Sequence, residues 1–188
     1  MHIRRPIIIA IAAVAGGGKT TVASRLSQRL ANAKALYFDE YDLEAPEDII
    51  EWVERGANSN EWNVGPIVAD MEKLVSSSEV EYILLDYPFG RSHDHLQAID
   101  FTIFLDTPLD VALARRILRD YELANAEEIK NDMQVYLQRG RLGYESMLYT
   151  IKPISDVVID GTLPVDEIVR IIENEIANLK QSTIHANH

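Results

Sequence analysis

The sequence contains no cysteine and few basic residues. Without cysteine, neither a disulfide bond nor a thiolate metal site can form, which suits the cytoplasm, the location that we expect. Only 18 Lys and Arg residues stand against 30 Asp and Glu residues, so the formal net charge is −12. Affinity for duplex nucleic acid depends on neutralising its phosphates, and an acidic chain is poorly suited to that task. We therefore expect no duplex nucleic acid among the partners.

Long apolar runs are absent as well. No stretch approaches the roughly 20 apolar residues that a membrane helix needs, so we expect no membrane partner. Apolar residues make up 47% of the chain and charged residues 26%, and both values are ordinary for a globular protein. The 188 residues fit one domain with a sizeable core, which we assign to residues 1–188. Composition leaves homo-oligomerisation open.

Apolar runs alternate with helical patterns from end to end, which favours an α/β fold with a parallel sheet. The expected strands cover residues 7–12, 35–38, 82–85, 101–105 and 156–159. The expected helices cover residues 19–31, 46–55, 65–76, 93–98, 108–121, 126–150 and 164–180. About five parallel strands with helices on both faces form a doubly wound, three-layer α/β/α sandwich. Ligands in such folds lie beyond the carboxyl ends of the strands, so the residues at those ends are the candidates for function.

A glycine-rich loop follows the first expected strand. Residues 13–21 read Ala-Val-Ala-Gly-Gly-Gly-Lys-Thr-Thr, which matches the phosphate-binding pattern G-x-x-x-x-G-K-[ST] except that Ala13 stands at its first position. Backbone N–H groups can approach phosphates only where no side chain intervenes, and Gly16, Gly17 and Gly18 supply such backbone. The helix that follows directs its positive N-terminal end at the same phosphates. Strand, loop and helix in this order predict a P-loop NTPase fold and a nucleoside triphosphate ligand.

The residues at the end of the loop have separate expected roles. Lys19 is predicted to reach the β- and γ-phosphates, and the Thr20 hydroxyl is predicted to bind Mg²⁺. Thr21 follows them into the helix, where it also suits packing or capping. The expected cofactors are ATP and Mg²⁺, and the expected nucleotide-binding residues are Ala15, Gly16, Gly17, Gly18, Lys19, Thr20 and Thr21.

Acidic residues follow the second and third expected strands. Phosphorylation of an alcohol needs a carboxylate that orients the hydroxyl and accepts its proton. Asp39, the first polar residue after the second strand, is the expected base, and Asp42 is the reserve and a candidate contact for the substrate. The competing interpretation of both is a cap or a solvated carboxylate. Asp86 ends the third apolar run, a pattern in which the acid holds Mg²⁺ directly or through water.

Two further segments follow strand ends. Arg91 comes shortly after the third strand and is either a contact for substrate or phosphate or a surface arginine. Asp106 and Thr107 follow the fourth strand and precede Pro108, a residue that suits the first turn of a helix. We therefore interpret Asp106 and Thr107 as residues that cap the next helix.

Three arginines gather on the helix predicted at residues 108–121. Arg115 and Arg119 lie four residues apart on one face, and we expect them to stabilise the charge that phosphoryl transfer spreads over the γ-phosphate oxygens. Arg116, on a face shared with Asp120, is expected to bind the nucleotide. The competing interpretation is a solvated helix face with ion pairs.

Two tryptophans flank a segment that is both polar and aromatic. Aromatic rings beside polar groups suit recognition of a flat ring or a sugar, which makes Trp52 and Trp62 candidate contacts for the substrate. Trp52 also fits the apolar side of a helix with Ile49, Ile50 and Val53, where it would belong to the core. The five histidines show no metal-ligand spacing with acids, and we expect them on the surface.

These segments resemble those of the P-loop kinases of the uridine kinase type, whose relatives phosphorylate nucleosides, pantothenate and phosphoribulose. The resemblance covers most of the chain and rests on residues 16–21, 38–41, 103–108, 114–120 and 151–159. It implies a helical lid at about residues 115–125 that closes over ATP, and an acceptor-binding insert at about residues 40–64. It also implies that Asp39 is the catalytic base. The sequence departs from the family at Asp86-Tyr87, where such kinases often have Glu-Gly.

The residues and the resemblance together imply ATP-dependent transfer of a phosphoryl group to a hydroxyl of a small molecule, with a nucleoside as the expected acceptor. The alternative is a P-loop ATPase or a nucleotide-dependent switch module that acts on a protein partner. A guanine-reading Asn-Lys-x-Asp segment, or a water-positioning Gln or Glu near the γ-phosphate, would indicate such a switch. The guanine-reading segment is absent from the sequence, so a small-molecule kinase is the favoured interpretation.

Overall fold

Five parallel strands form the sheet of the computed structural model, which describes residues 5–185 of the chain, with side chains as far as Gln181. The strands are β1 (Ile7–Ala12), β2 (Ala33–Tyr37), β3 (Tyr82–Asp86), β4 (Phe101–Asp106) and β5 (Val157–Asp160). Their order in the sheet is β2-β3-β1-β4-β5, and all four neighbouring pairs are parallel. The predicted five-stranded parallel sheet is confirmed.

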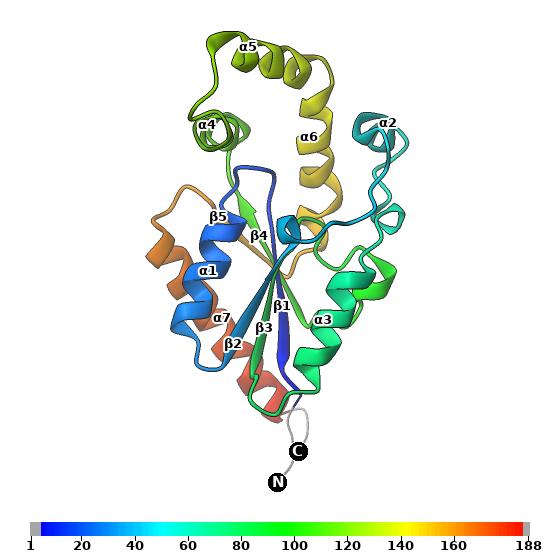
Figure 1. The fold of residues 1–188 in the computed structure, drawn as a ribbon. Coiled ribbons are helices and arrows are strands. Elements are labelled where there is room, and N and C mark those ends of the chain that lie inside the picture. Colours follow the sequence, from blue (N-terminus) through cyan, green and yellow to red (C-terminus); the bar gives the residue numbers. More distant parts are fainter. Residues whose placement is uncertain (1–4, 186–188) are drawn as a thin grey trace.

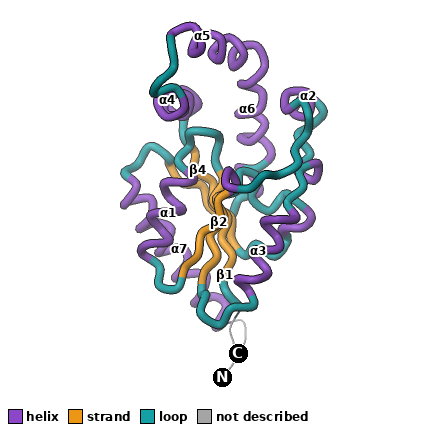
Figure 2. The backbone as a smooth tube through the Cα atoms, in the orientation of Figure 1, coloured by secondary structure: helices purple, strands orange, loops and turns teal. Residues whose placement is uncertain are grey.

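Helices cover both faces of this sheet, as the three-layer interpretation predicted (Figure 1). On one face α1 (Lys19–Arg29) contacts α7 (Val165–His185), and α3 (Gly65–Val75) lies on the other face. The carboxyl ends of the strands are overhung by four further helices (Figure 2), which are α2 (Ile49–Glu54), α4 (Leu109–Asp120), α5 (Ala126–Val135) and α6 (Arg141–Thr150). Within residues 5–185, no helix combines the length and the apolar character of a membrane-spanning segment.

The sheet divides the interior into two apolar clusters. In β1, Ile8 and Ala10 belong to the cluster on the α3 side, whereas Ile9 and Ile11 belong to the cluster beneath α1 and α7. All four side chains are fully buried. Alternate side chains of a strand point to opposite faces, so a strand that is apolar at every position needs cover on both faces. The unbroken apolar sequence of β1 thus explains its central place, which puts the glycine-rich loop at the middle of the sheet's carboxyl edge.

Two predicted helices differ from the observed ones. The stretch predicted as one helix at residues 126–150 contains a π-helical turn at Tyr136–Gly140, which separates α5 from α6. Such a turn is frequent at functional sites, and Gly140 lines the pocket described below. The helix predicted at residues 46–55 begins only at Ile49, because the Asp48 carboxylate accepts hydrogen bonds from backbone N–H groups of the first turn and caps the helix there.

The loop between β1 and α1 has the backbone shape that its glycines predicted. Gly16 and Gly18 have φ values of 78° and 102°, in the left-handed region that glycine adopts without steric penalty. Ala13, at the position of the missing glycine, is fully buried and is not among the residues with positive φ. Its methyl group faces Gly17, where an added Cβ would meet it at 2.6 Å. Alanine is therefore compatible with this loop as long as position 17 stays glycine.

We expect Gly16→Ala to destabilise the protein more than Gly18→Ala does. Both substitutions force a left-handed backbone on an L-residue, at a cost of about 1–3 kcal/mol. An added Cβ at Gly16 would also lie 2.0 Å from the carbonyl oxygen of Ala112 in α4, whereas at Gly18 the nearest atom belongs to Leu105 and is 3.9 Å away. Urea unfolding of the two variants measures the difference in free energy. Equal losses would show that α4 does not press on the loop.

Candidate active site

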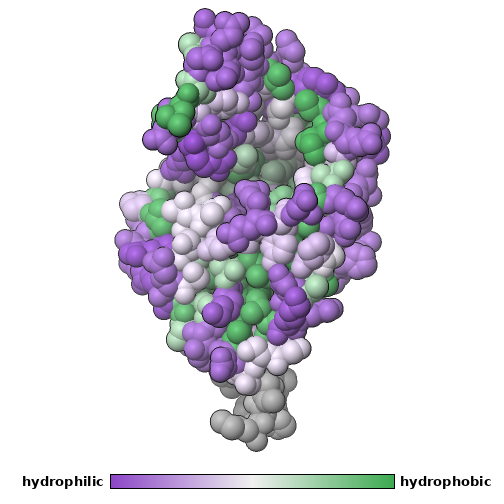
Figure 3. Space-filling model, viewed as in Figure 1, coloured by the Kyte–Doolittle hydropathy of each residue, from purple (hydrophilic) through white to green (hydrophobic). Residues whose placement is uncertain are grey.

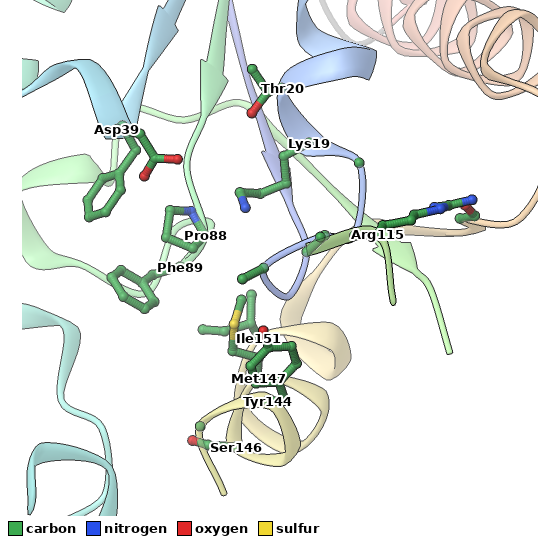
Figure 4. A pocket seen from close by; sticks show the side chains of 18 of the residues that line it. Lys19, Thr20, Asp39, Pro88, Phe89, Arg115, Tyr144, Ser146, Met147 and Ile151 are labelled. Atoms are coloured by element: carbon green, nitrogen blue, oxygen red, sulfur yellow. The ribbon is translucent and has the colours of Figure 1, made fainter. Parts of the chain in front are cut away.

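A pocket of about 1210 Å³ lies at the carboxyl edge of the sheet. Its walls come from the glycine-rich loop and the start of α1, the segment after β2, α2 and the loop after it, α4, and α6. Figure 3 shows the hollow between the overhanging helices, with hydrophilic side chains along its rim. Figure 4 shows Lys19, Thr20 and Asp39 toward one end of the pocket and Tyr144 and Met147 toward the other.

Thr20 and Asp86 meet where β1 and β3 end. The Thr20 hydroxyl donates a hydrogen bond to Asp86 Oδ2 at 2.5 Å. The Asp86 side chain is buried, and its second oxygen, Oδ1, has no hydrogen-bond partner. Burial raises the pKa of Asp86, and the Lys19 ammonium and the Thr20 hydroxyl oppose this rise. A buried carboxylate oxygen without a partner, beside a hydroxyl, suits a hard cation.

Mg²⁺ is the cation that the sequence implied, and this pair fits it. In phosphoryl-transfer sites Mg²⁺ is usually held by one or two protein groups together with phosphates and water, rather than by a cage of protein ligands. Among the residues that the structure describes, no three His, Asp or Glu side chains gather into such a cage. We therefore propose that Thr20 and Asp86 are the protein groups that hold Mg²⁺ when a nucleotide is bound.

Lys19 and Asp39 approach the same space from two different elements (Figure 4). Lys19 opens α1, and Asp39 lies in the 3₁₀ turn Phe38–Glu40 directly after β2. Burial lowers the pKa of Lys19, while the negative charges of Asp86 and Asp39 oppose that change. Asp39 is exposed and lines the pocket. The structure thus brings the expected phosphate-binding lysine, the expected base and the expected cation site together.

Arg115 and Arg119 of α4 both line the pocket but have different neighbours. Arg119 pairs with Asp120 at 2.6 Å, and the charge of Asp39 also raises the pKa of its guanidinium, after the larger effect of Asp120. Arg115 donates a hydrogen bond to the carbonyl oxygen of Gly161, in the turn after β5, at 3.0 Å. Arg119 is therefore the better placed of the two to act at the end of the pocket that holds Asp39.

Arg116 is not among the residues that line the pocket, and its role in nucleotide binding stays a prediction. It forms an ion pair with Asp132 of α5, and the two side chains are only 18% and 20% exposed. Asp120, which was expected to share a helix face with Arg116, pairs with Arg119 instead. Arg116 therefore joins α4 to α5 and stabilises the arrangement of the helices above the sheet.

Asp106 and Thr107 were expected to cap the helix that follows β4, but neither of them caps α4. Pro108 occupies the cap position, and no side chain caps the helix. The buried Thr107 hydroxyl instead donates a hydrogen bond to the carbonyl oxygen of Gly17 at 2.9 Å. Asp106 accepts a hydrogen bond from Lys152 Nζ at 2.6 Å. Thr107 thus links the end of β4 to the glycine-rich loop, a contact that the sequence did not reveal.

Asp42 and Arg91, two candidate contacts for the substrate, lie outside the pocket lining. Asp42 is exposed. Arg91 forms an ion pair with Asp156, which precedes β5, and donates a hydrogen bond to the carbonyl oxygen of Asp100, which precedes β4, at 3.3 Å. The connection after β3 therefore carries Arg91 to the amino ends of the strands. Its predicted place over substrate or phosphate is corrected.

Both tryptophans line the pocket, and Trp52 also belongs to the core. Trp52 is 5% exposed, and its Nε1 donates a hydrogen bond to the carbonyl oxygen of Asn58 at 2.8 Å. The ring of Trp62 lies 5.3 Å from that of Phe38 and 5.7 Å from that of Phe89, between centroids. Phe38 and Phe89, which follow β2 and β3, line the pocket as well and were not predicted.

The wall contributed by α6 was also not predicted. Gly140, Tyr144, Met147 and Ile151 line the pocket at intervals of three and four residues, which places them on one helical face. The Tyr144 hydroxyl is buried without a partner, and its ring meets that of Tyr136 edge to face at 5.3 Å. The spacing was readable in the sequence, but the predicted long helix gave no reason to choose this face over another.

One histidine lies in the interior rather than on the surface, where it was expected. His93 is 2% exposed, and its Nε2 lies 3.0 Å from the carbonyl oxygen of Trp62. It precedes a short 3₁₀ turn, Asp94–Leu96, that stands where the sequence predicted a helix at residues 93–98. His95 is exposed, as expected. The side chains of the other three histidines, His2, His185 and His188, lie outside the described part of the chain.

Comparison with curated proteins finds relatives at low identity, and no family model matches the chain. Uridine kinase-like protein 5 of Arabidopsis thaliana is 21% identical over 216 residues, which cover 98% of this chain and 46% of that protein. The uridine kinase of Chlamydia pneumoniae is 19% identical over 212 residues, which cover 96% of this chain and 93% of that protein. The chain thus spans about half the length of the plant protein and nearly all of the bacterial one.

Comparison with solved structures finds the same fold in kinases. A gluconokinase from Sinorhizobium meliloti aligns over 98% of this chain and 99% of its own, with a TM-score of 0.57 and 16% identity. A shikimate kinase from Aquifex aeolicus aligns over 93% and 99%, with a TM-score of 0.52 and 19% identity. A possible uridine kinase from Bacillus stearothermophilus aligns over 84% and 90%, with a TM-score of 0.54 and 20% identity. Together with the curated relatives, this shared fold confirms that the chain resembles the uridine kinase-like P-loop kinases.

Proposed function

We propose that the protein is an ATP-dependent phosphotransferase that acts on a hydroxyl of a small molecule, with a nucleoside as the first acceptor to test. The observation that carries the proposal is the meeting of Lys19, Thr20 and Asp39 at one end of a single pocket. Asp86 is buried and does not line the pocket, but it accepts a hydrogen bond from Thr20 there. The volume of about 1210 Å³ exceeds that of a typical site for one small ligand, about 300–1,000 Å³. The pocket therefore has room for a nucleotide and an acceptor together.

The residues of the pocket divide the work of the transfer. Asp39 orients the acceptor hydroxyl and takes its proton, since it is the carboxylate that lines the pocket beside Lys19. Lys19 and Arg119 stabilise negative charge on the transferred group. The backbone of Ala15 to Gly18 binds the nucleotide phosphates, and Thr21 lines the pocket beyond them. Mg²⁺, when bound, neutralises charge on the phosphate oxygens.

The proposed lid and the proposed acceptor-binding insert correspond to parts of the helices that overhang the sheet. Residues 115–125 comprise the end of α4 and the loop before α5, and residues 40–64 contain α2. α2 lies against α6, and both line the pocket. Movement of the proposed lid would exclude water and so suppress hydrolysis of ATP in the absence of an acceptor. A single domain, a cytoplasmic location and the absence of nucleic acid and membrane partners stay predictions from composition.

A phosphate-transfer screen tests the proposed function. The purified protein is incubated with ATP and Mg²⁺ and with a panel of nucleosides, pantothenate and sugars, and phosphorylated products are identified by mass spectrometry. We expect at least one phosphorylated acceptor and little ATP hydrolysis without it. Steady ATP hydrolysis with no phosphorylated acceptor, accelerated by a protein partner, would instead support the ATPase or switch module.

We expect Asp86→Asn to raise the Mg²⁺ concentration needed for half-maximal rate about 10- to 100-fold, which is the usual cost of weakening a metal site. The amide removes the negative charge but keeps the size and the hydrogen bond to Thr20. Initial rates measured over a range of Mg²⁺ concentrations at saturating ATP check this expectation. Asp106→Asn is the control, because Asp106 also ends a strand but pairs with Lys152. An unchanged Mg²⁺ requirement in Asp86→Asn would remove Asp86 from the cation site.

A further inference from the structure

The peptide bond between Gly17 and Gly18 has its two polar groups on opposite sides of the glycine-rich loop. The bond is trans, so its C=O and its N–H point in opposite directions. The Gly17 carbonyl oxygen accepts the hydrogen bond from Thr107, whose side chain is buried and is not part of the pocket lining. The N–H of Gly18 therefore points away from Thr107, toward the side on which Gly17 and Gly18 line the pocket.

The glycines alone do not determine this orientation. Reversal of the peptide changes mainly ψ of Gly17 and φ of Gly18, and glycine adopts both signs of φ at little cost. Gly18 has a φ of 102° in the observed orientation. In the reversed orientation the Gly17 carbonyl oxygen would point at the pocket, where its partial negative charge would repel phosphate oxygens. Three successive glycines thus need a contact from outside the loop that selects the orientation that can bind phosphate.

The turn after β5 holds the Thr107 side chain in place. A Cβ added to Gly161 would lie 1.9 Å from the Thr107 hydroxyl oxygen and 3.1 Å from its Cβ, so the glycine lets this turn pack directly against Thr107. Gly161 is itself held on both sides. Its N–H donates a hydrogen bond to the carbonyl oxygen of Asp106 at 3.2 Å, and its carbonyl oxygen accepts one from Arg115 at 3.0 Å. The Thr107 hydroxyl is therefore confined to the direction of the loop.

The start of α1 has no cap within the protein. Gly18 occupies the N-cap position, and no side chain accepts a hydrogen bond from the first N–H groups of the helix. Such groups are left for a ligand, and together with the helix dipole they favour an anion. An N–H of Gly18 that points to the pocket belongs to the same set of donors, so its direction affects how well phosphate is bound.

We propose that Thr107 is a positioning residue for phosphate binding, because its hydrogen bond to the Gly17 carbonyl oxygen turns the N–H of Gly18 toward the nucleotide phosphates. This inference rests on the proposed function, which places the phosphates beside Lys19, and adds to it a residue that does not touch the ligand. Thr107 acts through the peptide between Gly17 and Gly18. Its removal therefore weakens contacts to phosphate and leaves contacts to the rest of the nucleotide unchanged.

Thr107→Val tests the proposal, since it removes the hydroxyl and keeps the branched shape of the side chain. Dissociation constants of ATP, inorganic tripolyphosphate and adenosine are measured by calorimetry in the presence of Mg²⁺. We expect the constants for ATP and tripolyphosphate to rise about fivefold to tenfold, as for the loss of one hydrogen bond, and the constant for adenosine to stay the same. Thr107→Ser keeps the hydroxyl and is expected to bind all three ligands nearly as the unmodified protein does.

Thr102→Val is the matched control. Thr102 lies in β4, the strand that leads to Thr107, and it is also fully buried, but its hydroxyl has no hydrogen-bond partner. We expect this variant to bind all three ligands as the unmodified protein does. Thr107→Ala is a second variant without the hydroxyl, for use if valine prevents folding, and the same selective loss is expected of it.

The selectivity of the loss separates positioning from a defect in the fold, which would weaken all three ligands together. An unchanged affinity for tripolyphosphate in the folded Thr107 variants, an equal loss for adenosine, or an equal loss in Thr102→Val would overturn the proposal. The proposed function fails separately. If the unmodified protein binds tripolyphosphate in a way that depends on Thr107 but phosphorylates no acceptor, the phosphotransferase is contradicted and the role of Thr107 stands.

Discussion

Asp39→Asn is expected to lower kcat by about 10²–10⁴, the usual contribution of a positioned general base, while the affinity for ATP is retained. The amide has the shape of the carboxylate and can still contact the acceptor hydroxyl, but it cannot take the proton. Asp39 lines the pocket at the end of β2, and its charge acts on both Lys19 and Arg119. These neighbours are the groups that the proposed function places beside the transferred phosphoryl group. Single-turnover rates and ATP binding by calorimetry check the two parts of the expectation.

Asp42→Asn is the control for this experiment. Asp42 is three residues further along the chain and carries the same group, but it is exposed and does not line the pocket. We expect its replacement to leave kcat near that of the unmodified protein. A normal kcat for Asp39→Asn would contradict the assignment of Asp39 as the base. A loss of kcat in Asp42→Asn alone would instead indicate that Asp42 is the base.

The parts of the site that could be predicted from sequence are those that depend on local patterns and on the direction of the strands. The glycine-rich loop is one such pattern, and Asp39 and Asp86 each follow an apolar strand. Parallel strands end at the same edge of the sheet, so these residues had to lie near the loop once the sheet was correctly predicted. The fold followed for the same reason, since β1 to β5 are short apolar runs separated by helical patterns.

The parts that could not be predicted depend on which distant residue each side chain meets. Arg116 was expected to bind the nucleotide because it belongs to a cluster of three arginines on one helix, and nothing in the sequence indicated its ion pair with Asp132 on α5. Arg91 follows β3 closely in sequence, yet Asp156 holds it at the other end of the sheet. Thr107 precedes a helix, yet its hydroxyl donates a hydrogen bond to the Gly17 carbonyl oxygen instead of capping that helix. In each case a tertiary partner outweighs the local pattern.

Lys19→Ala is expected to lower kcat by about 10²–10³ or more, the cost of removing one preorganised electrostatic contact to the transition state. Lys19 is held beside Asp39 and the Thr20–Asp86 pair, and its partial burial strengthens its attraction to phosphate oxygens. Lys34→Ala is the control, because Lys34 is an exposed residue of β2 that does not line the pocket. Circular dichroism of both variants shows whether the fold is kept, and a kcat close to that of the control would contradict the role of Lys19.

The pH dependence of the residual activity of Lys19→Ala gives a second, independent readout. Burial raises the pKa of Asp86, and the Lys19 ammonium is the largest influence that opposes this rise. Without the ammonium the pKa of Asp86 is higher still, so as the pH falls the carboxylate is protonated sooner. The acid limb of the rate profile is therefore expected to move to higher pH in the variant than in the unmodified protein, and excess Mg²⁺ is expected to move it partly back, because the cation competes with the proton for the same oxygens. An acid limb at the same pH in both proteins would show that the ionisation of Asp86 does not set it.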